Sequence, residues 1–284
     1  MKKKKWLSAI LLVLAAGLLV WHASLHRPTG PAEGVAIHGH AAESPTVGRT
    51  LRIGTFNIHG CKGRDGHRDP DRVAECLADL DFVALNEVHG PRLWHDTDQA
   101  EQLGRRLGVG WLFAPVARVW YHRTAGNGLL SRLPVTFWQR IPLPRKLDHS
   151  YRNAVLVGLE HQGRTVHVLL THISRRHDAE REAQLRAVIG LYLSLAEPAI
   201  LLGDLNSDAE DRQIRRLLNT PGVEDPVGRI LGDKAPRRID WIVTRGFRPL
   251  DAGLIDNGSS DHPLVWAQLE PAVSSDASTD RGTQ

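Results

Sequence analysis

The feature of the sequence that most limits its fold is a series of short apolar runs between residues 51 and 270. Leu51–Ile58 alternates apolar residues with others as a strand does, and the apolar runs at 82–85 and 199–202 are typical of buried strands. We expect further strands at 111–121, 127–131, 135–141, 152–160, 165–171, 238–243 and 263–269.

Helical patterns lie between these strands. Asp69 is a good N-cap residue and Pro70 is favoured at the first helical position, so a helix is expected to begin there. Residues 96–107 and 178–195 are expected to form helices, and Ser207–Glu210 has the form of a capping box that opens another. Strands in succession with helices on their flanks predict an α/β fold of two stacked mixed sheets covered by helices.

Polar side chains recur where the expected strands end. Strand ends and the loops after them commonly carry binding and catalytic residues. One such residue would carry little information, but eight carboxylate, amide or imidazole side chains form a pattern. The eight are Asn57, Glu87, His172, Asp204, Asn206, Asp240, Asp261 and His262.

The N-terminus has the pattern of a targeting segment. Lys2–Lys5 precede an uncharged apolar run from Trp6 to Trp21, which predicts a signal peptide or an uncleaved membrane anchor over residues 1–23. A helix of that run spans about 24 Å. Cleavage after Ala23 would place bulky Trp21 where a small residue is preferred, which favours the anchor. Either reading places the rest of the chain outside the cytoplasmic membrane.

The remaining chain divides into three parts. Residues 24–50, rich in Ala, Gly, Pro and His, are expected to be a flexible linker, and residues 271–284 a disordered tail. Residues 51–270 are then one catalytic domain. Apart from the four N-terminal lysines, Lys and Arg balance Asp and Glu, so the domain lacks the overall positive charge of a nonspecific DNA-binding protein.

The polar residues at the strand ends suit hydrolysis of a phosphate ester. That reaction needs charge neutralisation, which Mg²⁺ on carboxylate oxygens supplies, and a base to activate water. A histidine supported by a carboxylate stabilises charge or moves a proton. The sequence has no G-x-S-x-G elbow, P-loop or G-x-G-x-x-G motif, which argues against a serine hydrolase and against those phosphate-binding loops.

Seven motifs in one order carry a family resemblance. The series resembles the endonuclease/exonuclease/phosphatase superfamily, which includes deoxyribonuclease I, exonuclease III-type repair nucleases, neutral sphingomyelinases and inositol-polyphosphate 5-phosphatases. The resemblance covers roughly residues 51–270 and implies a four-layer α/β sandwich. The motifs are Thr55–Gly60, Ala84–Val88, Gly126–Arg132, Leu170–His172, Leu202–Asn206, Arg238–Ile242 and Ser260–His262.

The resemblance implies catalytic roles for five of these residues. Asp204 matches the aspartate that orients or deprotonates the attacking water, and Asn206 matches its neighbour that hydrogen-bonds the phosphate. His262 matches the active-site histidine, and Asp240 matches the carboxylate that orients it. His172 matches a histidine that contacts phosphate, with a purely structural histidine as the alternative.

Further matches concern the metal and the substrate. Glu87 matches the principal metal-binding glutamate, and Asp261 a second metal contact, which implies Mg²⁺ with Mn²⁺ as the alternative. Asn57 matches an asparagine near the metal and phosphate. Arg152 lies where members often carry an arginine directed at the site, although an exposed arginine is the simpler reading.

Two residues depart from the family pattern. Asn86 stands where Gln is common, beside the metal-binding Glu87. His59 stands where repair nucleases tend to carry an aspartate that assists the metal, and imidazole is a poorer ligand for Mg²⁺ than for Mn²⁺ or Zn²⁺. This argues against a repair nuclease, and His59 either contacts phosphate or is a bystander.

We expect water to attack phosphorus in line, without a covalent enzyme intermediate. A nuclease-like phosphodiesterase is the first expectation, a phospholipid or sphingomyelin phosphodiesterase or a small-molecule phosphatase the second, and a non-catalytic binding module the third. The substrate is accordingly a nucleic acid, a lipid head group or a small phosphorylated compound. The chain is expected to be a monomer, attached to the membrane through its N-terminal helix or secreted if that helix is cleaved. Exposed tryptophans would favour a lipid substrate, and the residues to inspect are Trp94, Trp111, Trp120 and Trp138.

The chain has two cysteines, Cys61 and Cys76. In an oxidising compartment they could pair, and the alternative is that they are plain core residues. The sequence leaves both readings open.

Overall fold

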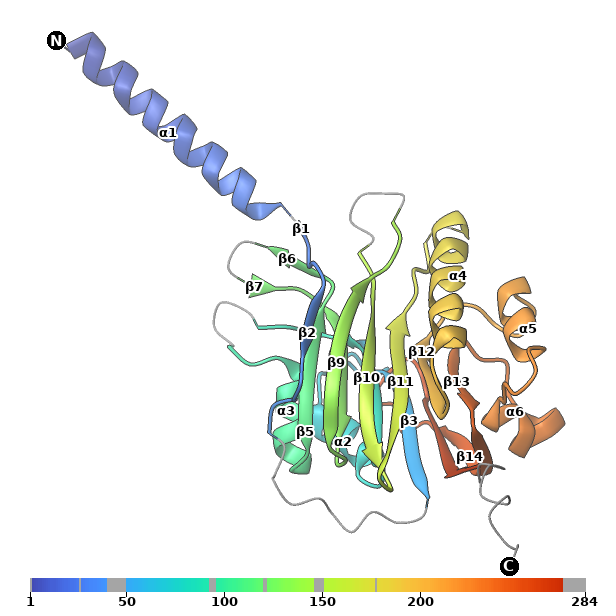
Figure 1. Cartoon of the computed structure of the whole chain (residues 1–284). Coiled ribbons are helices and arrows are strands. Elements are labelled where there is room, and N and C mark those ends of the chain that lie inside the picture. The colour runs from blue at the N-terminus through green and yellow to red at the C-terminus, as the bar shows by residue number, and fades with distance from the viewer. Residues whose placement is uncertain are drawn as a thin grey trace, which may run out of the picture.

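A computed structural model of the chain has two six-stranded sheets stacked face to face, with helices on both outer faces (Figure 1). Both sheets are mixed, because each contains one parallel pair, β11 with β12 and β3 with β4, among antiparallel pairs. This confirms the predicted α/β class with two mixed sheets flanked by helices. The described residues are 2–25, 27–39, 50–91, 96–119, 122–145, 151–176 and 178–272.

The strands of each sheet are not in chain order. The first sheet has the order β13-β12-β11-β10-β9-β2, and its strands are β2 (Ala32–Gly34), β9 (Val135–Pro142), β10 (Asn153–His161), β11 (Arg164–His172), β12 (Ala199–Asp204) and β13 (Asp240–Arg245). The second has the order β14-β15-β3-β4-β8-β5, and its strands are β3 (Leu51–Asn57), β4 (Phe82–Val88), β5 (Gly110–Pro115), β8 (Gly126–Ser131), β14 (Phe247–Ile255) and β15 (Leu264–Pro271). A small third sheet, β1-β6-β7, consists of β1 (Arg27–Pro28), β6 (Ala117–Val119) and β7 (His122–Arg123).

Helices cover the outer faces of the two large sheets. Apolar residues of α4 and α5 pack on the outer face of the first sheet, and those of α2 and α3 pack on the outer face of the second. The result is four layers, in the order helix, sheet, sheet, helix. The helices are α1 (Lys2–Ser24), α2 (Pro70–Leu77), α3 (Gln99–Leu107), α4 (Asp178–Ser194), α5 (Arg212–Leu218) and α6 (Pro226–Leu231), with 3₁₀ turns η1 (His59–Cys61) and η2 (Gly232–Lys234).

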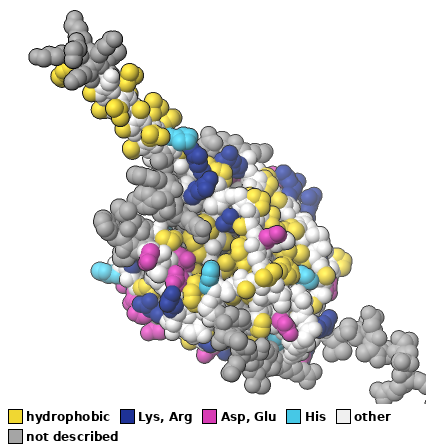
Figure 2. Space-filling model, turned by 60° about the vertical axis from the view of Figure 1, so that its left-hand side comes forward, with side chains coloured by type: hydrophobic (Ala, Val, Ile, Leu, Met, Phe, Trp, Pro, Cys, Tyr) yellow, Lys and Arg dark blue, Asp and Glu magenta, His cyan; other side chains and the backbone are white. Residues whose placement is uncertain are grey.

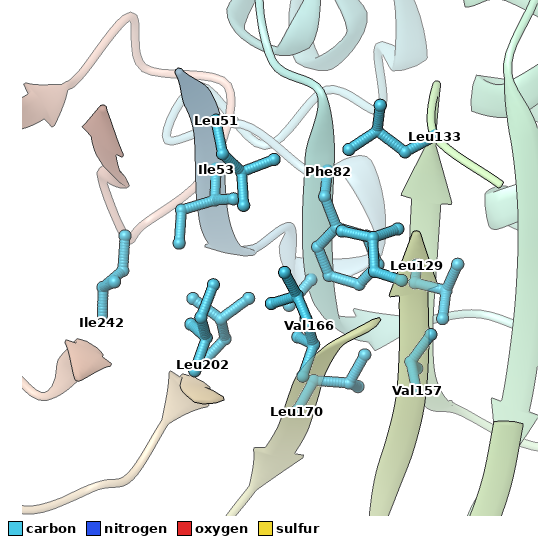
Figure 3. Close-up of a cluster of buried hydrophobic side chains, with 14 of the residues drawn as sticks. Leu51, Ile53, Phe82, Leu129, Leu133, Val157, Val166, Leu170, Leu202 and Ile242 are labelled. Atoms are coloured by element: carbon cyan, nitrogen blue, oxygen red, sulfur yellow. The ribbon is translucent and has the colours of Figure 1, made fainter. Parts of the chain in front are cut away.

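The largest core lies between the two sheets (Figure 3). Its residues come from alternate positions of the strands, because side chains two apart on a strand point to the same face. On β12, for example, Ile200 and Leu202 are fully buried in it, and on β4 Phe82 and Ala84 are.

The same inward-facing rows become polar at one end of the sandwich. Continuing each row by two residues leads from Leu202 to Asp204 on β12, and from Ala84 to Asn86 on β4. The strand period therefore delivers polar side chains between the sheets, at the edge of the apolar core. The residues placed this way are Asn57, Asn86, Asn127, His172, Asp204 and Asp240.

Part of the expected linker is structured. β2 pairs with β9, and His38 forms a bridge with Trp111 on β5, so residues 27–39 lie against the domain instead of forming a flexible linker. The physical reason is that β9 would otherwise be an edge strand with unpaired backbone groups, and that Ile37 is buried in the core between the sheets. Residues 40–49 and the tail from 273 lie outside the described residues.

The predicted helix starts and strand bounds agree with the structure only in part. Asp69 caps α2 as predicted, accepting hydrogen bonds from the backbone N–H groups of Asp71 and Arg72. The helix after β12 begins later than the capping-box motif at Ser207–Glu210 predicts. Asp211 caps it instead, accepting from the N–H groups of residues 213 and 214. The run predicted at 111–121 divides into β5 and β6, and the strand β14 was not predicted.

Helix α1 extends away from the domain (Figure 1). Its apolar side chains are exposed, with Trp6 at 73%, Leu12 at 72% and Leu19 at 69%. In the part of the chain that is described, no helix meets the length and apolarity needed to cross a membrane. The membrane-anchor prediction is therefore not confirmed.

The structure shows where the two cysteines and two of the four tryptophans singled out above lie. Cys61 and Cys76 are free, and both are buried in the apolar cluster between the helices α2 and α3 and the second sheet. Trp111 and Trp138 are half-buried against the cores, so neither offers an exposed aromatic side chain for lipid. Trp94 and Trp120 lie outside the described residues.

Candidate active site

The polar ends of β3, β11, β12 and β13 meet between the two sheets. Asn57 on β3 donates a hydrogen bond from Nδ2 to Asp204 Oδ2 on β12, at 3.0 Å, although the two residues lie in different sheets. His172 Nε2 on β11 is 3.4 Å from the same carboxylate oxygen. Asp204 is thus the point where side chains from both sheets converge.

Asp240 and His262 form a tightly bonded pair. His262 Nδ1 lies 2.7 Å from Asp240 Oδ2, and its other nitrogen, Nε2, lies 4.0 Å from Asp204 Oδ2. Burial by itself lowers the pKa of His262. The hydrogen bond and charge of Asp240, with the charges of Asp204 and Asp261, outweigh burial and raise this pKa to about 9. His262 is therefore protonated at neutral pH, and its Nε2 proton faces the Asp204 side.

Asp204 has the properties of a base that operates near neutral pH. It is 1% exposed. Burial, followed by the charge of Asp240, raises its pKa to about 7, while His262 and the hydrogen bond from Asn57 act in the opposite direction. A carboxyl group with a pKa near 7 is ionised in a large fraction of molecules at neutral pH and still accepts a proton readily.

His172 is a neutral imidazole beside this base. Burial lowers the pKa of His172 well below its usual value, and the positive charges of Arg152 and His262 lower it further. The two histidines of the site therefore differ in charge, since His262 carries a proton that His172 lacks.

Glu87 lies at an irregular point of β4. The pairing of β4 with β8 shifts between Leu85 and Val88, and Glu87 has a φ of 55°, which is unusual for a residue with a side chain. The bulge interrupts the regular alternation of side chains between the two faces of the sheet, and the Glu87 side chain lines a pocket of about 160 Å³. The pocket is lined by Glu87, His89, Val116, Ala125, Gly126, Asn127, Arg152 and His172.

Arg152 supplies positive charge to this pocket. Burial lowers its pKa, and the charges of Glu87 and Asp204 partly offset that effect. Among the described residues no carboxylate pairs with Arg152, and its Nε atom is buried without a partner. A partly buried guanidinium without a paired carboxylate suits an anionic ligand.

Loop residues complete the site. Asn206 donates its backbone N–H to Asp204 Oδ1 at 2.9 Å, but its side-chain amide donates to the carbonyl of Ile173. His59 Nδ1 lies 3.5 Å from Asp261 Oδ1, and both side chains are well exposed. His59 thus contacts the residue that was predicted as a second metal ligand.

The donor set fits a divalent metal ion. No described residue donates a hydrogen bond to the Glu87 carboxylate, which leaves both of its oxygens available in the pocket. Asp204, Asp240 and His262 form a second group whose ligand atoms lie within 4.8 Å of one another. Protonated His262 is a poor ligand, because a metal binds the neutral imidazole, so the oxygens of Glu87 and its neighbours suit Mg²⁺ better.

Three buried asparagines that the sequence analysis did not assign to the site join the two sheets beside it. Asn86 Oδ1 accepts the backbone N–H of Asp204 at 2.9 Å, and Asn86 Nδ2 donates to Asn127 Oδ1 at 2.8 Å and to the carbonyl of Thr171 at 3.1 Å. Asn127 in turn donates to the side chain of Asn153 at 2.9 Å. Each of these asparagines lies two positions from an inward-facing apolar residue of its own strand, and this spacing is the signal that could have identified it.

Comparison with protein families gives one match, to the model described as "Endonuclease/Exonuclease/phosphatase family", over residues 54–262. That range contains every residue predicted for the site. The comparison with curated proteins gives no match.

Solved structures share the fold. An endonuclease/exonuclease/phosphatase from Beutenbergia cavernae is 25% identical, with a TM-score of 0.62 over 79% of this chain and 72% of the other. D. rerio TDP2, in a complex with a single-strand DNA product, is 20% identical, with a TM-score of 0.61 over 78% and 98% of the two chains. A mannosyl-6-phosphatase from Bacteroides thetaiotaomicron is 16% identical, with a TM-score of 0.60 over 77% and 99%.

Proposed function

Because the chain belongs to the Endonuclease/Exonuclease/phosphatase family, whose members hydrolyse phosphate esters, we propose that it is a metal-dependent phosphodiesterase of the nuclease type. The observation that carries this proposal is the arrangement of Asp204 between the neutral His172 and the protonated His262. A base and a cationic proton donor about 4 Å apart suit the two sides of a phosphate ester under attack by water.

The catalytic cycle follows from the charges of these residues. Asp204 accepts a proton from water as the water attacks phosphorus in line. The bond from phosphorus to the leaving oxygen breaks, solvent protonates that oxygen, and Asp204 releases its proton to solvent. His262, held by Asp240, donates a hydrogen bond to a phosphate oxygen and stabilises the developing negative charge. His172 and Arg152 bind the remaining phosphate oxygens, and Arg152 offsets their charge. No covalent enzyme intermediate is required.

A divalent metal ion, when bound, would neutralise negative charge on the phosphate. Glu87 would hold it, with Asp261 and the Asn57 side-chain oxygen as further oxygen donors. We propose Mg²⁺ as the physiological ion, with Mn²⁺ as an alternative that His59 would favour. Asn206 supports the site chiefly through its backbone N–H on Asp204.

We propose further that the catalytic domain acts as a monomer outside the cytoplasmic membrane. The support is the sequence of four lysines followed by the exposed apolar side chains of α1. An uncleaved α1 would attach the domain to the membrane surface, and cleavage would release it.

A second candidate is a phosphodiesterase that acts on a phospholipid or another phosphorylated small molecule. The exposed apolar surface of α1 favours it, since a membrane-attached enzyme meets lipid head groups. The catalytic residues and their roles would be the same, because they contact the phosphate and not the alcohol.

The test uses the full chain in detergent with supercoiled plasmid, in Mg²⁺ and separately in Mn²⁺. Nicking that is abolished by EDTA and by His262→Ala would support the nuclease. A folded, metal-loaded protein that nicks nothing would refute it. Release of phosphorylated head groups from phosphatidylcholine or sphingomyelin vesicles, lost in His262→Ala, would then support the second candidate.

A further inference from the structure

The three-stranded sheet β1-β6-β7 places arginines directly opposite one another. Arg27 on β1 pairs in register with Arg118 on β6. Like charges at opposing positions of adjacent strands repel and destabilise the pairing. Arg27 and Arg118 are exposed, and no described carboxylate pairs with either. This repulsion would be relieved by an anionic partner.

This arginine surface, defined by Arg27 and Arg118, adjoins the end of α1. The Arg27 Nη2 atom lies 3.2 Å from His22 Nδ1 on α1, so the side chain contacts the helix itself. Figure 2 shows dark-blue Arg or Lys side chains where the helix joins the domain. Trp21, 61% exposed, lies one residue before His22, and tryptophan is the residue that prefers the level of lipid head groups.

The arginine surface also adjoins the catalytic pocket. Thr29, two residues after Arg27, donates its backbone N–H to the carbonyl of Val116 at 3.1 Å. Val116 lines the pocket that holds Glu87 and His172. β1 and β6 lie beside the C-terminal end of α1 (Figure 1), and Val116, which directly precedes β6, connects this region to the pocket.

We propose that Arg27 and Arg118 bind anionic phospholipid head groups, so that the catalytic pocket faces the bilayer surface. The proposal rests on the membrane association proposed above. A bilayer is favoured over a nucleic acid as partner because the arginines adjoin an exposed apolar helix, which a nucleic acid would leave in water. Substrate would then reach the pocket along the membrane surface.

The experiment measures which end of the domain lies nearer the bilayer. β11 runs about 30 Å between its two ends, from Arg164 at the far end to His172 at the pocket, so exposed Arg164 and Arg175 mark the two ends. A fluorescent donor is attached through Arg164→Cys or Arg175→Cys in the full chain. Cys61 and Cys76 are buried, and burial raises the pKa of both thiols, so they react slowly.

The labelled proteins are bound to phosphatidylcholine vesicles containing 30% phosphatidylglycerol and an acceptor-labelled lipid. We expect stronger energy transfer from position 175 than from position 164. Arg27→Gln with Arg118→Gln should abolish that difference. The matched control, Arg215→Gln with Arg216→Gln, removes two exposed arginines from α5 and should preserve it. Equal transfer from both positions in the parent protein, or a difference that survives Arg27→Gln with Arg118→Gln, would overturn the proposal.

Two further outcomes are distinguishable. A protein that does not bind vesicles at all refutes the membrane association on which the proposal depends, and leaves the nicking assay unaffected. Binding of a single-stranded oligonucleotide that is lost in Arg27→Gln with Arg118→Gln, but not in the control, would assign the surface to nucleic acid and overturn the lipid proposal.

Discussion

Replacing Asn86 with leucine should destabilise the domain by about 2–6 kcal/mol. The side chain is fully buried and makes three hydrogen bonds, two of them to the other sheet and one to Asn127 in its own sheet. Leucine has a similar volume, so the loss is mainly polar. It would leave the Asp204 N–H and the Asn127 Oδ1 atom without these partners, and each buried unpaired group costs about 1–3 kcal/mol. The total is a large share of the roughly 5–15 kcal/mol that a domain has.

The assay is equilibrium unfolding of the full chain in urea, followed by the fluorescence of the tryptophans, among which Trp241 is buried. Asn219→Leu is the matched control, because Asn219 is exposed and no hydrogen bond of its side chain is found among the described residues. It should change the free energy of unfolding by less than about 0.5 kcal/mol. A loss below about 1 kcal/mol for Asn86→Leu would refute the reasoning that the amide joins the sheets.

Three further predictions concern the site. The proposed mechanism requires ionised Asp204 and protonated His262, so kcat/KM should rise with pH through about 7 and fall through about 9. Asp240→Asn should move the alkaline limb down towards 6.5, and an unmoved limb would contradict the assignment. The raised pKa of His262 gives stability that is fully present below about pH 6.5 and lost as pH rises through 9, about 3 kcal/mol in all; urea unfolding at pH 6 and pH 9.5 should show this loss in the parent and a smaller one in His262→Gln. Glu87→Gln should raise the Mg²⁺ concentration for half-maximal activity at least about tenfold without lowering stability, and EDTA should abolish activity reversibly; an unchanged metal requirement would exclude Glu87 as a ligand.

The site residues at the strand ends could be predicted from the sequence, because the strand period and the order of the motifs both point to them. The strand period places Asp204 two residues beyond buried Leu202, and the motif order places the same residue beside Asn206. The contacts of Asp204 with Asn57 and His172 agree with these placements. The chemical roles of these residues stay predictions.

Other features depend on long-range packing, which a local pattern does not report. Asn86 and Asn127 meet only because β4 and β8 are paired, and Asn86 reaches Asp204 only because the two sheets stack. β1 and β2 have two and three residues, too few for a period to be read. The helix α5 begins after Asp211, whose side chain accepts hydrogen bonds from the backbone N–H groups of residues 213 and 214, and the capping-box pattern at Ser207–Glu210 did not reveal this start.

The backbone at three site residues has a consequence for the evolution and engineering of the chain. In the described part, five residues other than glycine have positive φ, and His59, Glu87 and Asn206 are three of them. Such conformations cost about 1–3 kcal/mol for residues with side chains, and glycine would relieve most of that. Selection for heat resistance alone would therefore favour glycine at Glu87, and would remove a carboxylate from the pocket while making the protein more robust. Thermostable variants of this chain should be screened for hydrolysis at every step, because stability and catalysis compete for the same backbone positions.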